Sequence, residues 1–377
     1  MNLIFTADLH IKPRTWGSIP SLSGDAYHSL RQIADLCLAH QAALVIGGDI
    51  FDTPRPSAAD AEQFGLMVDR IASEGLPVGV IQGNHDFADP PWPTVLNPQL
   101  THLEKKLTYP WTNFGIYGLD ARNPADLENA LSFVPKEAKA VILHQLCKEV
   151  FPLGWNFSLE WVPPHVTHVW IGDYHERIDQ MFERTDGPPV RLLSPGSTHV
   201  TNIRDPWEKS VFLIQRSADL PLDDSANSDA DGIVVTPIPL RTRPYHACVV
   251  NEEADLDRLV ERFQELPVGD PSDPLRFPVF VVDYRTDVPY VESRLQAALG
   301  DAGSRKGYLW LRPTVIKAVI GSEEEAPIEE TADVADCLAE FASPGTELHS
   351  LCADLLNAEQ TAPVFERWRK SVGIENV

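Results

Sequence analysis

The sequence has 377 residues, of which 43% are hydrophobic and 23% are charged, and this composition is typical of a globular protein with a sizeable core. Its formal net charge is −24, so any strong affinity for nucleic acid has to come from metal ions, local basic residues or a partner. No apolar run approaches the roughly 20 residues that span a bilayer. The first residues lack the charged start of a signal peptide, and the five cysteines are scattered without a Cys-x-x-Cys pair. We therefore expect a cytoplasmic protein without membrane spans, disulfides or a thiolate zinc site.

Residues 1 to about 215 alternate short apolar runs with helical patterns, which predicts α/β layering. The expected strands fall near residues 3–5, 45–48, 78–81, 114–117, 140–143, 169–171, 190–197 and 207–214. Helices are expected at 25–41 and 58–74, the second with Ser57 as its N-cap. The proline-rich residues 87–112 are expected to form a surface excursion. The last two strands are expected to close a β-sandwich.

The pattern of the sequence changes near Leu240. A β-α-β-α pattern follows, with strands near 247–250 and 279–284 and helices near 252–266 and 291–299. The last part of the chain is acidic and then helical, with an apolar face at 348–356. That face either binds a partner or packs on the chain itself. We accordingly divide the chain into a main domain at 1–238, a small α/β cap domain at 239–320, and an acidic linker with a helical segment at 321–377.

Five of the expected strands end in polar motifs. They are Asp8-Leu9-His10, Gly48-Asp49-Ile50-Phe51-Asp52, Gly83-Asn84-His85-Asp86, His144, and Gly172-Asp173-Tyr174-His175. Each motif taken alone has an ordinary explanation in capping or packing. Five of them in this order, each directly after an apolar run, indicate one shared site at the carboxyl edge of the sheets.

Carboxylate oxygens together with imidazole nitrogens suit Mn, Fe or Zn better than Mg or Ca alone. Two ions about 3.5–4 Å apart clamp the attacking and leaving oxygens in phosphoryl transfer. Asp49, at the central strand end, is the expected bridge between two such ions. The other ligands divide into two sets. One set is Asp8, His10 and His175, and the other is Asn84, His144 and Asp173.

Two further residues have expected roles in catalysis. His85 follows a ligand without having to be one, so it is placed to hydrogen-bond the phosphate and protonate the leaving oxygen. Asp52 lies three residues after the bridging carboxylate, where it is expected to hold the His85 imidazole in the right tautomer.

The five motifs in this order resemble the calcineurin-like metallophosphoesterase superfamily over about residues 1–215. A narrower likeness, reaching roughly residue 320, is to the SbcD family of double-strand-break repair nuclease subunits. It is carried by the Pro and Ser after Asp52 and by three further stretches: Ser194-Pro195-Gly196-Ser197 with Glu208-Lys209, Ile238-Pro239-Leu240, and Arg243-Pro244-Tyr245. The resemblance implies a metallophosphoesterase β-sandwich flanked by helices. It also implies an endo- and exonuclease with two manganese ions, with Mg²⁺ as the other candidate.

The resemblance also implies partners. The cap would contact DNA, and the C-terminal helical segment would dock on the coiled-coil base of an SbcC-like ATPase. We expect a homodimer within a heterotetramer. One departure from the family pattern is Asp173, which stands where the family has the first His of Gly-His-x-His. Aspartate is a harder ligand, so we expect metal binding to survive with a stronger preference for Mn²⁺ or Mg²⁺.

Two other readings of the sequence stay open. The chain would be a stand-alone nucleotide phosphodiesterase or phosphatase of the same superfamily, which needs no cap domain. Alternatively, it would be a metal-binding scaffold that has lost catalysis. Asp173 favours the last reading, and the presence of His85 and Asp52 argues against it.

Overall fold

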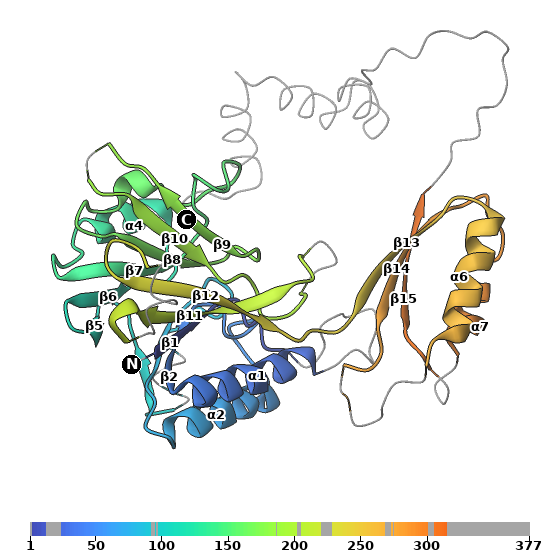
Figure 1. The fold of residues 1–377 in the computed structure, drawn as a ribbon, viewed down its shortest axis with the longest axis horizontal. Coiled ribbons are helices and arrows are strands. Elements are labelled where there is room, and N and C mark those ends of the chain that lie inside the picture. Colours follow the sequence, from blue (N-terminus) through green and yellow to red (C-terminus); the bar gives the residue numbers. More distant parts are fainter. Residues whose placement is uncertain are drawn as a thin grey trace, which may run out of the picture. The chain divides into compact units, whose positions relative to one another are not determined.

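A computed structural model describes residues 2–12, 24–91, 95, 97–185, 187–201, 205–219, 228–267, 273, 275–300 and 305–314 (Figure 1). The chain separates into two units at 1–316 and 317–377, and the expected helical segment at 321–377 lies outside the described residues. The described part contains two six-stranded sheets and one three-stranded sheet. None of its helices combines the length and apolar character needed to cross a membrane. Its three cysteines, Cys37, Cys147 and Cys248, are free.

The first sheet contains the amino-terminal strand next to its centre. In spatial order its strands are β12 (Ile233–Leu240), β11 (Lys209–Arg216), β1 (Asn2–Thr6), β2 (Ala42–Gly47), β3 (Val78–Ile81) and β4 (Leu100–His102). Strands β1 to β4 run parallel, whereas β11 and β12 are antiparallel additions. β12 carries Pro237 and Pro239 and forms an edge, where the missing N–H groups remove no ladder hydrogen bond.

The second sheet is built in the same way. In spatial order its strands are β5 (Leu107–Trp111), β6 (Phe114–Gly118), β7 (Ala138–His144), β8 (His168–Gly172), β10 (Val190–Ser194) and β9 (Ile178–Phe182). Strands β6, β7, β8 and β10 are parallel, and β5 and β9 close the two edges in antiparallel pairing. The expected closing strands are therefore β10 in this sheet and β11 in the first.

The expectation of a surface excursion at 87–112 is wrong in part, because β4 and β5 lie inside that segment. Leu100 and Trp111 are buried, at 9% and 6% exposure, and these two side chains bring the segment onto the sheets. Pro110 lies in β5, which is an edge strand and so tolerates it. Because the segment is rich in proline, these two short strands were not predicted from the sequence.

The two large sheets pack face to face as a β-sandwich. Side chains from both inner faces form one buried cluster, in which the rings of Phe5 and Trp170 lie 5.3 Å apart. Helices α1 (Asp25–His40) and α2 (Ala58–Ala72) cover the outer face of the first sheet, and α4 (Pro124–Leu131) packs outside the second (Figure 1). Ser57 caps α2 by accepting a hydrogen bond from the Asp60 N–H, as expected. A short 3-10 helix, η1 (Leu159–Trp161), precedes β8, and another, η2 (Ser217–Asp219), follows β11.

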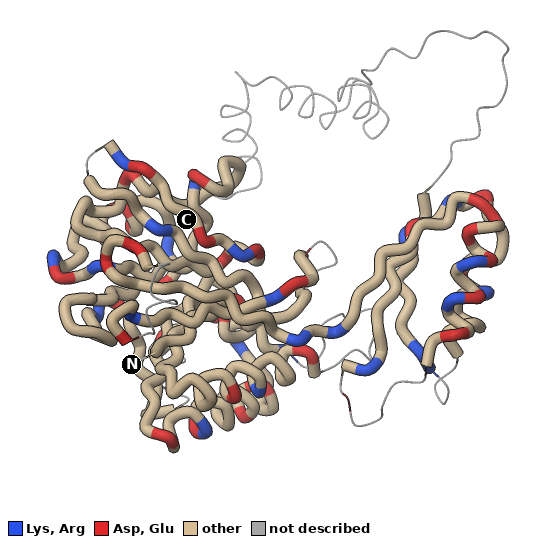
Figure 2. The backbone as a smooth tube through the Cα atoms, viewed as in Figure 1, with Lys and Arg blue, Asp and Glu red and all other residues tan. Residues whose placement is uncertain are grey.

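The segment after β12, which we call the cap because the sequence predicts one there, has the expected β-α-β-α order and one more strand. Its parallel sheet has the order β13 (Tyr245–Val250), β14 (Val279–Arg285) and β15 (Tyr308–Thr314), of which β15 was not predicted. Helices α6 (Glu253–Glu265) and α7 (Val291–Leu299) cover this sheet through a separate apolar core. Figure 2 shows acidic and basic residues mixed along this part of the chain.

Candidate metal centre

Every residue predicted for the site lies where a strand of one of the two large sheets ends. Asp8 and His10 follow β1, Asp49 and Asp52 follow β2, Asn84 and His85 follow β3, His144 ends β7, and Asp173 and His175 follow β8. Three strands of one sheet and two of the other thus deliver nine side chains to one edge of the sandwich. Parallel neighbours end at the same edge, which explains why motifs far apart in sequence meet.

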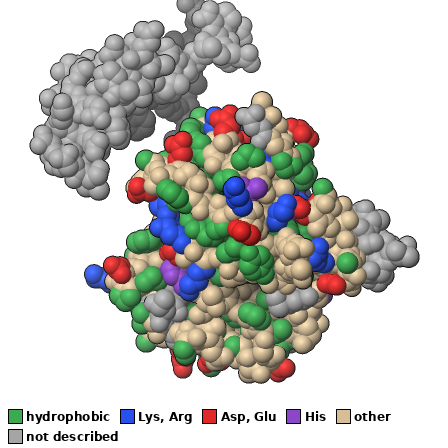
Figure 3. All heavy atoms as spheres, turned by 90° about the vertical axis from the view of Figure 1, so that its left-hand side faces the viewer, with side chains coloured by type: hydrophobic (Ala, Val, Ile, Leu, Met, Phe, Trp, Pro, Cys, Tyr) green, Lys and Arg blue, Asp and Glu red, His purple; other side chains and the backbone are tan. Residues whose placement is uncertain are grey.

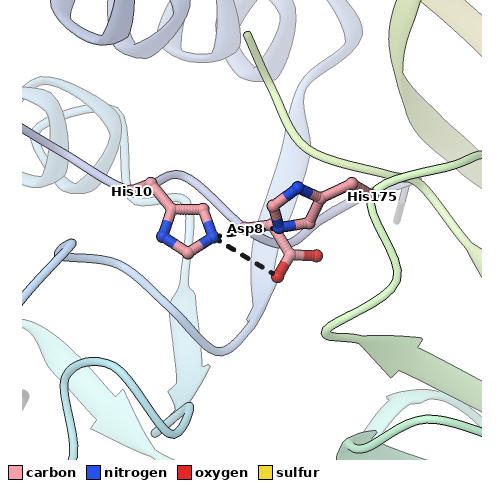
Figure 4. Close-up of side chains that lie close together, drawn as sticks. All are labelled: Asp8, His10 and His175. Atoms are coloured by element: carbon pink, nitrogen blue, oxygen red, sulfur yellow. Dashed lines mark hydrogen bonds and ion pairs between the residues drawn. The ribbon is translucent and has the colours of Figure 1, made fainter. Parts of the chain in front are cut away.

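One group of donors consists of Asp8, His10 and His175 (Figure 4). The Nε2 atoms of His10 and His175 face each other at 3.1 Å, and His10 Nε2 is 4.0 Å from an oxygen of Asp8. Two imidazole nitrogens and a carboxylate oxygen that converge in this way form a donor set suited to a transition metal.

A second group of donors surrounds His144. Its Nε2 atom lies 3.0 Å from Oδ1 of Asn84 and 3.9 Å from Oδ1 of Asp173. The same nitrogen lies 3.9 Å from Oδ1 of Asp8. The other ring nitrogen, Nδ1, is 2.7 Å from the carbonyl oxygen of Gly47. The main chain therefore takes up Nδ1, and Nε2 is directed into the site.

Asp49 lies between these two groups. Its Oδ2 atom is 3.6 Å from His10 Nε2 on one side and 3.3 Å from His144 Nε2 on the other. Its Oδ1 atom accepts a hydrogen bond from the His85 backbone N–H at 2.9 Å. A carboxylate held in this orientation is placed to bridge two cations.

The backbone at the site is strained. Asp8, His10, Asp49 and Asp173 all have positive φ, at 51°, 39°, 49° and 75°. This region is sparsely populated for residues other than glycine, and each instance costs on the order of 1–3 kcal/mol. Gly83 also has no room for a side chain, since an added Cβ would overlap the Asp49 carboxylate. The contacts within the site, rather than the intrinsic backbone preferences of these residues, therefore determine the local conformation.

The carboxylates at the site give it an excess of negative charge. Burial alone would lower the pKa of His144, but the carboxylates of Asp49, Asp8 and Asp173 outweigh this and raise it well above its usual value. Burial, with repulsion from Asp8 and Asp49, raises the pKa of Asp173. Oδ2 of Asp8 is buried and has no hydrogen-bond partner among the described residues. Crowded carboxylates and an unpartnered oxygen are what a bound cation would satisfy, so the residues fit a metal.

Asp52 contacts His85 through its backbone rather than its side chain. The carbonyl oxygen of Asp52 lies 3.2 Å from His85 Nδ1. The Asp52 carboxylate instead accepts a hydrogen bond from Lys12 at 2.9 Å and lies 3.5 Å from His10 Nδ1. A carbonyl oxygen can only accept a hydrogen bond, so this contact places the His85 proton on Nδ1. The Nε2 atom of His85 is then the one left for substrate.

Sequence reasoning missed a buried network behind His175. Asp205 lies 3.4 Å from His175 Nδ1, and its other carboxylate oxygen accepts hydrogen bonds from the backbone N–H and hydroxyl of Thr201. The ammonium of Lys209 lies 3.9 Å from Asp205 and donates to the Ser197 hydroxyl at 2.6 Å. Burial lowers the pKa of Lys209 to about 8. Sequence singled out Glu208-Lys209, but it gave Lys209 no role, since the contact with Asp205 depends on how the loop folds.

Asp86 is a second residue whose role was missed, although it closes the Gly83-Asn84-His85-Asp86 motif. Its carboxylate accepts hydrogen bonds from the backbone N–H groups of Ile50 at 2.7 Å and Gly83 at 2.9 Å. Burial, together with repulsion from Asp49, raises the pKa of Asp86 to about 6. Asp86 thus joins the turns that carry Asp49 and Asn84.

A cleft of about 450 Å³ opens beside the second donor group. Asn84, His144 and Asp173 line it together with Phe87 and Asn156. It is large enough to hold a nucleotide-sized group next to the candidate ligands.

The sequence profile of the family described as calcineurin-like phosphoesterase matches residues 1–206. The chain is 27% identical over 248 residues to a DNA double-strand break repair protein Mre11 from Sulfurisphaera tokodaii, and the match covers 60% of this chain and 62% of that protein. It is 21% identical to the protein of the same name from Sulfolobus acidocaldarius, with both chains fully covered. A crystal structure of a protein from Thermus thermophilus matches 56% of this chain and 92% of that chain at 11% identity, with a TM-score of 0.33, which is too low to argue from.

Proposed function

This chain belongs to the calcineurin-like phosphoesterase family, a family of metal-dependent enzymes, and we propose that it is a two-metal DNA nuclease that processes double-strand breaks. The observation that carries the proposal is the Asp49 carboxylate, which lies between two groups of histidine and carboxylate donors. The two relatives named as DNA double-strand break repair proteins support DNA as the substrate.

The proposed ligands are the seven named from the sequence. Asp8, His10 and His175 would hold one ion, Asn84, His144 and Asp173 the other, and Asp49 both. When bound, two divalent ions supply positive charge at the attacking and leaving oxygens of a phosphodiester. Mn²⁺ suits this mixture of nitrogen and oxygen donors, and Mg²⁺ is the alternative.

His85 is the proposed proton donor. Its Nδ1 atom is tied to the Asp52 carbonyl oxygen at 3.2 Å, and its ring meets the His10 ring edge-on at a centroid distance of 4.9 Å. These contacts hold the imidazole by Nδ1 and by its ring, which would leave Nε2 to meet a phosphate bound at the site. A protonated Nε2 would donate its proton to the leaving oxygen, which is the usual task of a positioned histidine. The His10 ring is held in turn by the Asp52 carboxylate, which lies near His10 Nδ1 and accepts a hydrogen bond from Lys12.

The net charge of −24 suggests that a partner supplies part of the affinity for DNA. Figure 3 shows Lys and Arg side chains interspersed with Asp and Glu on one face of the molecule, without a continuous basic track there. We propose an SbcC-like ATPase partner that docks on the segment within 321–377 for which the sequence predicts a helix, and a cytoplasmic homodimer within a heterotetramer. The cap domain at 239–320 would contact DNA.

The first experiment measures cleavage of linear double-stranded and single-stranded DNA with Mn²⁺, with and without chelator. His85→Ala should lower cleavage by about 100- to 10,000-fold, the usual contribution of general acid catalysis. His165→Ala is the matched control, because that ring bonds to the Pro135 carbonyl oxygen outside the site. Calorimetric titration should give two Mn²⁺ per chain, and a single ion would contradict the two-metal assignment.

A stand-alone phosphodiesterase is the second candidate, and the cleft of about 450 Å³ favours it, since that volume suits a small phosphodiester. Turnover of bis(p-nitrophenyl) phosphate without any cleavage of DNA would select it. Turnover of neither would select the scaffold reading and would make Asp173→His the next variant to assay.

The partner proposal has its own test. Deletion of residues 330–377 should abolish co-purification with the ATPase while leaving hydrolysis of the small phosphodiester intact. Unchanged ATPase binding after the deletion would show that the segment is not the docking site.

A further inference from the structure

The loop that follows His144 exposes large apolar side chains next to the candidate metal centre. Between β7 and η1, Phe151 is 37% exposed, Leu153 83% and Trp155 38%. Exposed aromatic residues gathered in one loop are unusual on a monomer surface unless they contact something. We call four residues the aromatic ledge: Phe151, Tyr174 next to it, Trp155, whose ring meets that of Trp161, and Phe87, which lines the adjoining cleft with Asn156.

The loop is held firmly in place. A β-bridge joins Cys147 to Phe157, and both side chains are fully buried. The backbone N–H of Asn156 donates to the Leu146 carbonyl at 2.9 Å. The Glu149 carboxylate accepts hydrogen bonds from the Ser158 hydroxyl at 2.8 Å and from the Leu159 N–H at 3.1 Å. These contacts hold the loop backbone in place before any ligand arrives, so binding requires little ordering of the loop.

The ledge is continuous with the metal centre. Its loop begins directly after His144, and the ring of Phe151 lies 6.1 Å from the ring of Tyr174, which stands between Asp173 and His175. Phe87 and Asn156 line the same cleft as His144 and Asp173. A strand whose phosphate lies at the metal centre would therefore pass its neighbouring bases over these rings.

The chemistry of the ledge fits bases more closely than an aliphatic partner. Lys148 places its ammonium 5.5 Å from the centre of the Trp155 ring, so a cation lies beside the aromatic faces. Aromatic rings that stack on bases, with a nearby cation for the backbone, are the recurring means of binding single strands without sequence preference.

Building on the proposed nuclease function, we propose that the aromatic ledge stacks the unpaired bases of single-stranded DNA adjoining the scissile phosphate. Paired bases already stack on their neighbours and cannot offer a free face to Phe151 or Trp155. The ledge would thus favour single-stranded tails and frayed ends over intact duplex.

The test measures binding apart from cleavage. Fluorescence anisotropy of labelled oligothymidylate, with chelator and low salt, should show about tenfold weaker binding for Trp155→Ala, since stacking on one ring is worth about that factor or more. Trp155→Phe should retain most of the affinity. Phe133→Ala is the matched control, because that ring is 72% exposed after α4 and outside the ledge. Unchanged binding by Trp155→Ala, or equal losses in Trp155→Ala and Phe133→Ala, would overturn the proposal.

Replacing Phe151 separates base stacking from general apolar docking. Phe151→Leu keeps the apolar surface and removes the ring, so it should weaken oligothymidylate binding as Phe151→Ala does. Full retention of oligothymidylate binding by Phe151→Leu would show that the Phe151 ring is not needed and would overturn base stacking there.

Cleavage data separate this proposal from the nuclease proposal. In Trp155→Ala the rate of single-strand cleavage should fall about tenfold relative to the rate of bis(p-nitrophenyl) phosphate hydrolysis. Wild-type protein that binds oligothymidylate but cleaves no DNA would refute the nuclease and leave the ledge standing. An equal loss on both substrates would place Trp155 in the hydrolytic machinery and overturn the ledge.

Discussion

The edge of the sandwich that carries the candidate metal centre and the cap differ in how deeply their charged side chains are buried. At the edge, Asp8, Asp49 and His144 are almost fully buried. Asp8 and Asp49 have a strained backbone with positive φ, and both carboxylates crowd the His144 ring. In the sheet and two helices of the cap, no charged side chain is buried, and local surface pairs form, such as Arg294 with Asp257 and Arg312 with Asp283, both at 2.5 Å. The cap core, between its sheet and α6 and α7, consists of apolar side chains.

This contrast indicates that the residues of the cap are arranged to stabilise the fold, whereas those at the edge of the sandwich are arranged to bind a ligand. Exposed ion pairs contribute little to stability and tolerate substitution, so the cap follows the ordinary rules of packing. Buried carboxylates that repel one another, on a backbone with positive φ, oppose folding and persist only where function requires them. Substitutions in the two regions should therefore differ in both sign and size.

The largest effect is expected at Asp173. Asp173→Asn should weaken Mn²⁺ binding by roughly 100-fold, since taking the negative charge from a direct ligand should cost at least as much as losing a residue that orients one. In chelator the same variant should melt a few degrees higher, because it removes a carboxylate that Asp8 and Asp49 repel. Calorimetry with Mn²⁺ and thermal melts in chelator measure the two effects, and a lower melting temperature without metal would contradict the account of crowded charge.

The second effect tests the network behind His175. Asp205→Asn should weaken Mn²⁺ binding about 10- to 100-fold, because Asp205 orients the His175 ring through Nδ1. Asp179→Asn is the control, since that carboxylate pairs with Arg191 on the surface of β9 and β10. Unaltered metal affinity in Asp205→Asn would show that His175 needs no such support.

A moderate effect is expected where His168 meets Asp229, away from the metal centre. Burial acts to raise the pKa of Asp229, but His168, 2.9 Å away, together with the Ile233 N–H and Arg191, outweighs it and lowers the pKa to about 2. Because the folded pKa lies below the unfolded one, the stabilisation is complete above about pH 4 and is lost as pH falls through about 2. After allowance for solvent screening it amounts to about 1–2 kcal/mol.

Urea unfolding of wild type and Asp229→Asn at pH 6 and pH 3 measures this effect. The difference in the free energy of unfolding between the two proteins should shrink at the lower pH. A difference that stays constant between these pH values would show that ionisation of Asp229 does not contribute.

The smallest effect is expected in the cap. Arg294→Ala should change the free energy of unfolding by less than about 0.5 kcal/mol, although Arg294 pairs with Asp257, because the pair is solvent-exposed. Chemical denaturation of the full chain measures it. A loss above about 2 kcal/mol would mean that the surface pairs of the cap hold it together, and the contrast between the two regions would fail.

Sequence reasoning grouped the residues of the candidate metal centre because they stand directly after apolar strands. Each motif could be read locally, and parallel pairing then brought the strand ends together. Asp205 and Lys209 were missed because their role depends on how the segment after β10 folds, which no periodic pattern predicts. β4 and β5 were missed because prolines lie around them and one of the strands is only three residues long. In the cap, α6 and α7 followed from apolar spacing, whereas β15 lies beyond the predicted pattern.

The pairing of β1 with β11 sets an order for biosynthesis. Leu3 pairs with Ile214, so the amino-terminal strand waits for a partner that the ribosome delivers roughly 210 residues later. At about 5–20 residues per second this interval is roughly 10–40 s. During that time one edge of β1 has no partner strand. For much of the interval Asp173 and His175, which follow β8, have not yet been synthesised. The nascent chain therefore cannot complete the candidate metal centre until β8 and the residues after it have emerged, and β1 keeps one unpaired edge until β11 emerges.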